Sequence, residues 1–238
     1  MMNFTGKTAV ITGADGGMGT VICKSLAAEG ANLALCSVNG AHLDEVVASL
    51  RAEYTDCRIV SAQVDVTDEK QVEAFIAKAA EAFGTFDLLI NLAGLSIPSQ
   101  YKETEEATYD AMMDVNVKGS FLMSKHFAAH AANPSRIINV GSMAARNTNA
   151  NAPIYCMAKA AVNKLSEGLL LQLGKQGIAV STVNPGGADT PFWGTRAVDR
   201  SKLMSAEDVA EVILFVARLA DHIQLHSVDF ESAAKFRG

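Results

Sequence analysis

Apolar residues in this chain fall into short unbroken runs that are separated by longer stretches with helical spacing. Each run fits a strand of a few residues that is buried on both faces, because a strand exposed on one face alternates apolar and polar residues instead. The predicted strands are Thr8–Thr12, Leu33–Cys36, Ile59–Ala62, Phe86–Ile90, Ile137–Val140 and Ala179–Val183, with Leu225–Phe230 as a seventh.

The stretches between these runs repeat apolar residues three and four positions apart, as on one face of an amphipathic helix. The clearest example is Asp68–Phe83, for which Thr67 is the expected N-terminal cap. Ser205 is the expected cap of another, Ser205–Ala220. The remaining stretches with this spacing are Thr20–Glu29 and His42–Tyr54.

Strands alternate with helices along the whole chain, and the connections between them are short. This alternation favours right-handed strand–helix–strand units, which place the strands in one parallel sheet with helices on both faces. We therefore predict an α/β fold with a doubly wound sheet of about seven strands. No change in composition divides the chain, so residues 1–238 are predicted to form a single domain.

A glycine-rich turn follows the first predicted strand and opens the first helix. It reads Thr12-Gly13-Ala14-Asp15-Gly16-Gly17-Met18-Gly19. Glycines here allow a tight turn and a close approach of the backbone to a pyrophosphate, and the helix N-terminus presents free N–H groups to the anion. The turn therefore predicts a dinucleotide bound at the carboxyl ends of the strands.

The overall charge is acidic, with 26 Asp and Glu residues against 20 Lys and Arg residues and a formal net charge of -6. No cluster of basic residues occurs, so nucleic acid and anionic membranes are not expected partners. An anionic cofactor remains compatible with this charge, because backbone N–H groups bind its pyrophosphate.

Several features argue against a membrane-spanning, secreted or metal-binding protein. The longest uncharged stretches, Gly30–Leu43 and Leu88–Tyr101, have 14 residues each, whereas a spanning helix needs about 20 apolar residues. The N-terminus lacks the pattern of a signal peptide, and the four cysteines form no CxxC pair. His126 and His130 could share a helical face, but no third metal ligand accompanies them. These features predict a cytoplasmic protein without a metal.

The motifs, in this order, resemble those of the short-chain dehydrogenase/reductase family, in its short single-domain branch. The family's TGxxxGxG matches Thr12, Gly13, Gly17 and Gly19, and its NNAG matches Asn91-Leu92-Ala93-Gly94, with Leu92 in place of the second Asn. Its YxxxK pair matches Tyr155 and Lys159, and its PGxxxT loop matches Pro185, Gly186 and Thr190. The resemblance extends over nearly the whole chain and implies a Rossmann-type sheet with strand order 3-2-1-4-5-6-7.

The resemblance also implies a catalytic set made of Asn116, Ser142, Tyr155 and Lys159. Tyr155 would exchange a proton with an alcohol or a ketone while hydride moves to or from a nicotinamide ring. Ser142 would bind the substrate oxygen, and Asn116 would hold a water behind Lys159. Tyr155 and Lys159 are four residues apart and so share one helical face. We expect the Lys159 ammonium, with the positive ring of an oxidised nicotinamide, to lower the pKa of Tyr155.

The residues expected to contact the cofactor lie at the carboxyl ends of the predicted strands. They are Thr12, Gly13, Asp15, Gly17, Met18, Gly19, Ser37, Val38, Asp65, Val66, Asn91, Ala93, Gly94, Tyr155, Lys159, Pro185, Gly186, Ala188 and Thr190. By resemblance, Asp65 contacts the adenine, and the backbone of Ala188 meets the nicotinamide carboxamide. Ser37 stands where an acid binds the ribose of NAD, and Val38 where an Arg often marks NADP. The missing base favours NAD, and NADP stays open.

Two segments are expected to shape the substrate pocket, Met143–Asn151 and a loop over residues 187–204. The candidate substrate residues are Arg146, Asn147, Phe192, Trp193 and Arg196. Their mixture predicts a substrate that joins a hydrophobic ring or chain to a polar or anionic group. Alternatively, the Asn residues serve loop turns and Trp193 packs on the core.

The predicted activity is that of an NAD(P)-dependent oxidoreductase acting on a secondary alcohol or ketone. Two alternatives stay open: a relative that senses the cofactor without turnover, and a sugar-nucleotide epimerase or dehydratase, which also uses a YxxxK pair. Surplus apolar residues on the helix that holds Tyr155, among them Leu165, Leu169 and Leu171, predict a homodimer or a homotetramer.

Overall fold

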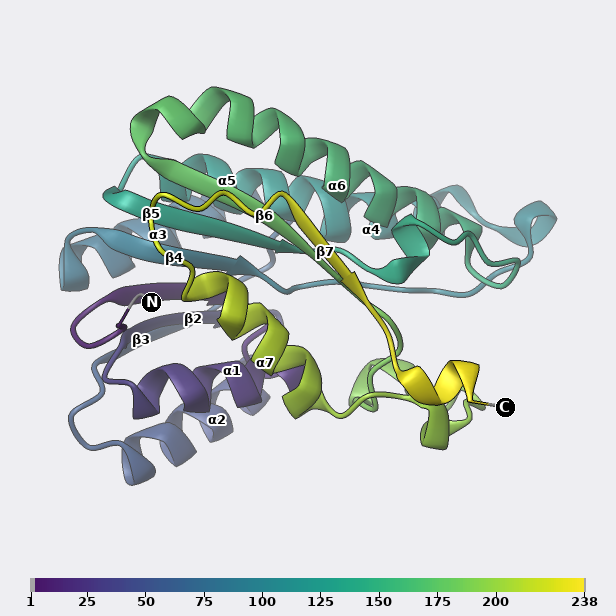
Figure 1. Ribbon diagram of the computed structural model, residues 1–238, viewed down its shortest axis with the longest axis horizontal. Coiled ribbons are helices and arrows are strands. Elements are labelled where there is room, and N and C mark those ends of the chain that lie inside the picture. The colour runs from purple at the N-terminus through teal and green to yellow at the C-terminus, as the bar shows by residue number, and fades with distance from the viewer. Residues whose placement is uncertain (1–2, 238) are drawn as a thin grey trace.

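Seven parallel strands form one sheet in the order β3-β2-β1-β4-β5-β6-β7, which confirms the prediction (Figure 1). The structure is a computed structural model that describes residues 3–237, so the predicted domain ends at 1 and 238 lie outside the described residues. The strands are β1 Thr8–Thr12, β2 Asn32–Ser37, β3 Ile59–Gln63, β4 Phe86–Asn91, β5 Ala131–Val140, β6 Ile178–Pro185 and β7 Ser227–Phe230.

Helices cover both faces of this sheet. They are α1 Gly17–Ala28, α2 Gly40–Glu53, α3 Glu69–Phe83, α4 Glu106–Met113, α5 Gly119–Ala128, α6 Pro153–Leu173 and α7 Ala206–Ala217. α1, α2 and α7 lie on one face and the other four on the opposite face (Figure 1). In β1, Ala9 and Ile11 pack into the core beneath the first group, and Val10 packs into the core beneath the second. The apolar runs therefore arise because both faces of the central strands are buried.

The two edge strands, β3 and β7, are less buried than the central ones. The sequence predicts that Ile59–Ala62 is buried on both faces, but these residues of β3 are only half-buried. β7 alternates exposed and half-buried residues. The prediction is wrong here because an edge strand has a neighbour on one side only, so its residues keep contact with solvent.

Helix caps were predictable at one of the two positions tested. Asp68, not Thr67, caps α3, and its carboxylate accepts two N–H groups of the first turn. Thr67 turns back towards β3 instead, where its hydroxyl donates to the Asp65 carboxylate at 2.8 Å. The prediction for Ser205 is confirmed, since its hydroxyl accepts the N–H of Asp208 at 3.0 Å at the start of α7.

Some apolar side chains on the outer helices stay uncovered. Phe121 of α5 and Met157 and Leu171 of α6 are exposed. Met157 and Leu171 belong to the helix for which the sequence predicts a subunit interface, and the homodimer or homotetramer stays a prediction. In the described part of the chain, no helix combines the length and the apolar character needed to cross a membrane.

Candidate active site

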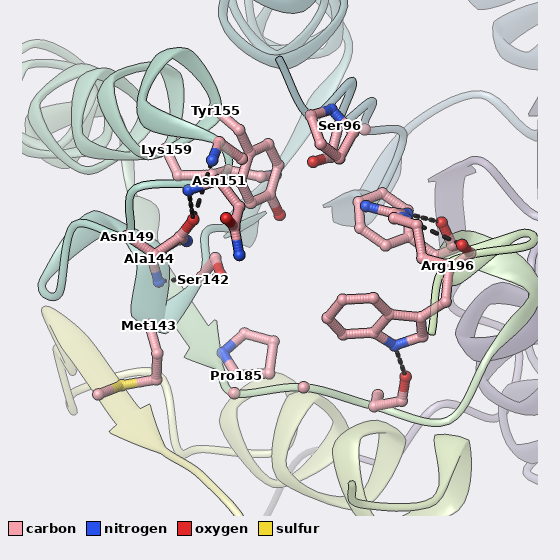
Figure 2. Close-up of a pocket in the computed structure, with 18 of the residues that line it drawn as sticks. Ser96, Ser142, Met143, Ala144, Asn149, Asn151, Tyr155, Lys159, Pro185 and Arg196 are labelled. Carbon is pink, nitrogen blue, oxygen red and sulfur yellow. Dashed lines mark hydrogen bonds between the residues drawn. The ribbon is translucent and has the colours of Figure 1, made fainter. Parts of the chain in front are cut away.

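A cleft of about 1000 Å³ opens at the carboxyl edge of the sheet. Its walls come from the segment after β4, the turn after β5, the first turns of α6 and the chain after β6 (Figure 2). Across residues 3–237, no group of three or more His, Cys, Asp or Glu side chains gathers as a metal site. His126, considered above as a metal ligand, contacts Glu69 at 3.1 Å on the surface.

The glycine-rich turn after β1 leaves no room for side chains. Gly13 adopts a φ of +63°, in the left-handed region that favours glycine. A Cβ at Gly19 would collide with the carbonyl oxygen of Gly13, and a Cβ at Gly17 would lie 3.1 Å from the Thr190 side chain. α1 begins at Gly17 without a side-chain cap, so its first N–H groups are available to an anion. The turn therefore fits the pyrophosphate of a dinucleotide.

Replacing Gly19 with alanine is expected to weaken dinucleotide binding by about tenfold or more, because the new Cβ forces the backbone of the turn to move. The matched control is Gly168→Ala in α6, where the new Cβ meets no atom within 4 Å. That control is expected to keep the affinity and to add about 0.5–1 kcal/mol of stability. Calorimetric titration with NAD and with NADP measures the affinities of the two variants, and urea unfolding measures the stability of Gly168→Ala. An unchanged affinity in G19A would contradict the prediction.

Three of the four predicted catalytic residues meet on one wall of the cleft (Figure 2). Ser142 follows β5, while Tyr155 and Lys159 lie one turn apart on α6. The Lys159 Nζ is 5.8 Å from the centre of the Tyr155 ring and donates to the carbonyl oxygen of Val140 at 2.8 Å. The Ser142 hydroxyl accepts the N–H of Ala144 at 3.1 Å.

Asn116, the fourth predicted residue, lies behind this wall in a π-helical turn between α4 and α5. It is fully buried, and its Nδ2 donates to the carbonyl oxygens of Met112 and Leu95, both at 2.8 Å. Asn116 and Lys159 both approach Gly94, where a Cβ would lie 3.1 Å from the Asn116 Oδ1 and 3.4 Å from the Lys159 Nζ. The water expected between the two side chains stays a prediction.

Burial acts on both titratable groups of the Tyr155–Lys159 pair. It raises the pKa of Tyr155 to about 12, against smaller opposing effects of the hydrogen bond with Ser142 and the charge of Arg196. It lowers the pKa of Lys159 to about 8. Within the chain itself, the pKa of Tyr155 is therefore raised and not lowered as expected, because the loss of hydration outweighs the neighbouring charges.

An interior amide that the sequence analysis missed holds the Ser142 turn in place. Asn184, near the end of β6, is fully buried, and its Oδ1 accepts the N–H of Ser142 at 3.1 Å. Its Nδ2 donates to the carboxylate of Asp229 in β7 at 2.7 Å. A Cβ at Gly141 would collide with this amide, so Gly141 and Asn184 fit each other. An Asn within a buried strand gives no local signal of such a contact.

Arg146 lies on the far side of Asp229 and does not line the cleft. Its Nε donates to the second Asp229 oxygen at 3.0 Å, and its Nη2 donates to the Ser227 hydroxyl at 3.0 Å. The structure contradicts its predicted contact with a substrate, because the ion pair with β7 holds the side chain away. Asn147 does line the cleft. The Asn149 carbonyl serves the turn before α6, as the alternative interpretation predicts, by accepting two backbone N–H groups.

Fourteen of the nineteen predicted cofactor residues fall into three groups. Those that line the cleft are Met18, Gly94, Tyr155, Lys159, Pro185, Gly186, Ala188 and Thr190. Those at or just after the ends of β2 and β3, outside the cleft lining, are Ser37, Val38, Asp65 and Val66. Thr12 and Asn91 face the interior: the Thr12 hydroxyl accepts the N–H of Ala93 at 3.0 Å. The Asn91 amide donates to Asn139 at 2.8 Å, which ties β4 to β5, and the contact of Asn91 with the cofactor stays a prediction.

The predicted substrate loop packs against the catalytic wall. The ring centre of Phe192 lies 6.1 Å from that of Tyr155, and the indole N–H of Trp193 donates to the carbonyl oxygen of Ala188 at 2.7 Å. Two other parts of the cleft lining were not predicted from the sequence, one between residues 96 and 103 and the other at Glu231. The first follows β4 and could have been found from its place at a carboxyl strand end. The second depends on the pairing of β7 with β6, which no local pattern reveals.

Comparisons with known proteins show the family to which the chain belongs. Residues 7–201 match the family described as short chain dehydrogenase. An uncharacterised oxidoreductase of Staphylococcus saprophyticus is 30% identical over 230 residues, which cover 96% of this chain and 98% of that protein. A second, from Staphylococcus aureus strain MRSA252, is 32% identical over 236 residues with the same coverage.

Solved structures of the same kind superimpose closely. A short-chain dehydrogenase/reductase from Serratia marcescens has a TM-score of 0.89 at 27% identity and covers 97% of this chain and 98% of its own. A short chain dehydrogenase from Burkholderia cenocepacia in complex with NADP has a TM-score of 0.90 at 29% identity, with coverage of 98% and 100%. Sequence, fold and relatives agree over nearly the full length, so this protein is an oxidoreductase that belongs to the short-chain dehydrogenase/reductase family.

Proposed function

We propose that this protein transfers a hydride between a nicotinamide dinucleotide and a secondary alcohol or ketone. The observation that carries the proposal is the meeting of the Tyr155 phenol, the Ser142 hydroxyl and the Lys159 ammonium on one wall of a cleft beside a glycine-rich turn. The structural relative from Burkholderia cenocepacia, which was solved with NADP, supports a nicotinamide cofactor.

The cofactor would be held by the N-terminus of α1 at its pyrophosphate and by the chain after β6, including Pro185, Gly186 and Thr190, at its nicotinamide half. When bound, the nicotinamide ring supplies or accepts the hydride. The residues of the chain transfer the proton and bind the substrate oxygen.

Ser142 lines the cleft beside Tyr155, where its hydroxyl would donate a hydrogen bond to the substrate oxygen and keep its own proton. Tyr155 gives a proton to a ketone oxygen during reduction, or takes one from an alcohol during oxidation. Lys159 places its positive charge beside the Tyr155 ring, where it stabilises the phenolate that oxidation requires. Its bond to the Val140 carbonyl fixes the direction of the ammonium group.

The proposal is tested by following nicotinamide absorbance with a panel of hydroxysteroids, keto acids, sugars and aryl ketones. Turnover that depends on the cofactor supports a dehydrogenase or reductase. A relative that senses the cofactor would bind it without turnover, and an epimerase or dehydratase would convert a sugar nucleotide without net change of the cofactor. Either of those results contradicts the proposal.

We further propose that NAD is preferred to NADP. At the end of β2, the Ser37 hydroxyl accepts the N–H of Asn39 at 3.1 Å, and Val38 is neutral and 68% exposed. Asp15 lies near this end, because the N–H of the preceding residue, Ala14, donates to the Cys36 carbonyl oxygen at 3.2 Å. A 2′-phosphate brings a charge of about −1.5 to −2, which Asp15 would repel.

Reduced NAD is expected to bind about tenfold more tightly than reduced NADP, as titration by nicotinamide fluorescence would show. Val38→Arg is expected to shift this ratio towards NADP, because it supplies a cation for the phosphate. Val38→Ala is the matched control, which removes the side chain without adding charge and is expected to keep the preference for NAD. Tighter binding of reduced NADP by the unmodified protein would contradict the proposal.

A further inference from the structure

The guanidinium group of Arg196 forms part of the cleft wall that faces Tyr155 and Ser142 across the open space (Figure 2). It lies over two aromatic rings, with its Cζ 5.2 Å from the centre of Phe192 and 5.0 Å from that of Trp193. Such stacking holds a planar guanidinium in one orientation. The group is therefore a fixed part of the wall.

Two backbone carbonyl groups fix the orientation further. The Arg196 Nε donates to the Trp193 carbonyl oxygen at 2.8 Å, and its Nη2 donates to the Phe192 carbonyl oxygen. These bonds use the Nε–Nη2 edge of the guanidinium. The opposite edge, formed by Nη1 and the second N–H of Nη2, is left to bind a planar anion such as a carboxylate through two parallel hydrogen bonds.

The charge of Arg196 has no protein counterion among the described residues, which sets it apart from its neighbours. Arg200, in the same segment, is paired with Asp189, and Lys235 on the cleft wall is paired with Glu231. Lys159, the third cation of the wall, donates to a carbonyl group and is assigned to the reaction itself. An oriented guanidinium without a carboxylate partner, facing the reacting groups, fits a negatively charged ligand.

We propose that Arg196 binds a carboxylate group of the substrate, so that this protein acts on ketones or secondary alcohols that carry a carboxylate. This inference rests on the proposed function. The Phe192 ring lies between Tyr155 and Arg196, in contact with both, and offers an apolar surface to the part of the substrate that joins its carbonyl to its carboxylate. Burial raises the pKa of Tyr155, and the positive charge of Arg196 is a small effect that opposes this rise, as expected for groups that face each other across the cleft.

The first test compares two oxo acids, levulinate and benzoylformate, with their methyl esters, which keep the ketone and lose the charge. The unmodified protein is expected to prefer an acid to its ester by about tenfold or more in kcat/KM. Arg196→Met is expected to abolish this preference by raising KM for the acid, with little change for the ester. Lys202→Met, which removes an exposed cation from the same segment, is the matched control and is expected to keep the preference.

A second test needs no turnover, because Trp193 is the only tryptophan of the chain and is stacked on Arg196. Binding of an oxo acid is expected to change its fluorescence in the unmodified protein and not in Arg196→Met. Turnover of esters and acids without preference, or a preference that survives in Arg196→Met, would overturn the role of Arg196 while the proposed function stands. If neither these substrates nor those of the wider panel are turned over, the proposed function fails. The fluorescence titration then decides the carboxylate site: a change that is lost in Arg196→Met supports it, and the absence of any change overturns it.

Discussion

Replacing Tyr155 with phenylalanine is expected to lower kcat about a thousandfold and to leave cofactor affinity unchanged. The substitution removes the phenol hydroxyl that exchanges a proton with the substrate oxygen in the proposed reaction, and such proton transfer contributes roughly 10²–10⁴ in rate. The ring itself remains, so its packing on Phe192, with ring centres 6.1 Å apart, is kept. Steady-state kinetics and calorimetric titration of the cofactor measure the two effects separately.

The matched control for this variant is Tyr54→Phe, which removes a phenol hydroxyl that donates to Glu53 at the end of α2. It is expected to retain full activity.

In the unmodified protein, alcohol oxidation is expected to accelerate with rising pH, because Tyr155 accepts a proton only after it has lost its own. Burial raises the pKa of that phenol to about 12, so positive charge in the loaded site has to bring the value down for oxidation at neutral pH. Turnover that survives in Y155F would remove Tyr155 from the mechanism.

The parts of the site that could be predicted from sequence depend on short-range spacing. The glycine-rich turn could be identified because it directly follows β1, and a collision at Gly19 now explains one of its glycines. Tyr155 and Lys159 could be placed together because four residues make about one helical turn. The sheet order followed from the resemblance, and the alternation of strands and helices predicted the layers around it.

The rest depends on contacts between segments far apart in the chain. Arg146 has the chemistry of a substrate residue, yet Asp229 of β7, which lies 83 residues later, holds it outside the cleft. Asn184 supports Ser142 from a strand whose sequence shows only burial. The raised pKa of Tyr155 was missed for a related reason, since hydration loss depends on how completely other segments cover the phenol.

Replacing Lys159 with methionine is expected to lower kcat by about a hundredfold or more. The same substitution is expected to change how the free energy of unfolding depends on pH. Lys159 is buried, and burial lowers the pKa of its ammonium from 10.5 to about 8. Below about pH 8 both the folded and the unfolded chain carry this proton, so the cost of the buried charge is fully present. Between about pH 8 and 10.5 the folded chain loses the proton first, and this cost is relieved as the pH rises.

The sign of the effect follows from proton binding. In this window the unfolded chain binds more protons than the folded one, so the free energy of unfolding of the unmodified protein rises with pH relative to that of Lys159→Met, by about 3 kcal/mol in total. Urea unfolding at pH values on both sides of the window measures the difference. Lys164→Met, on the same helix but paired with Glu167 at the surface, is the matched control and is expected to follow the unmodified protein. If the stability of Lys159→Met showed the same pH dependence as that of the unmodified protein, the Lys159 ammonium would not be desolvated in the folded chain. Loss of turnover together with the altered pH dependence would show that the same buried ammonium lowers stability and serves the reaction.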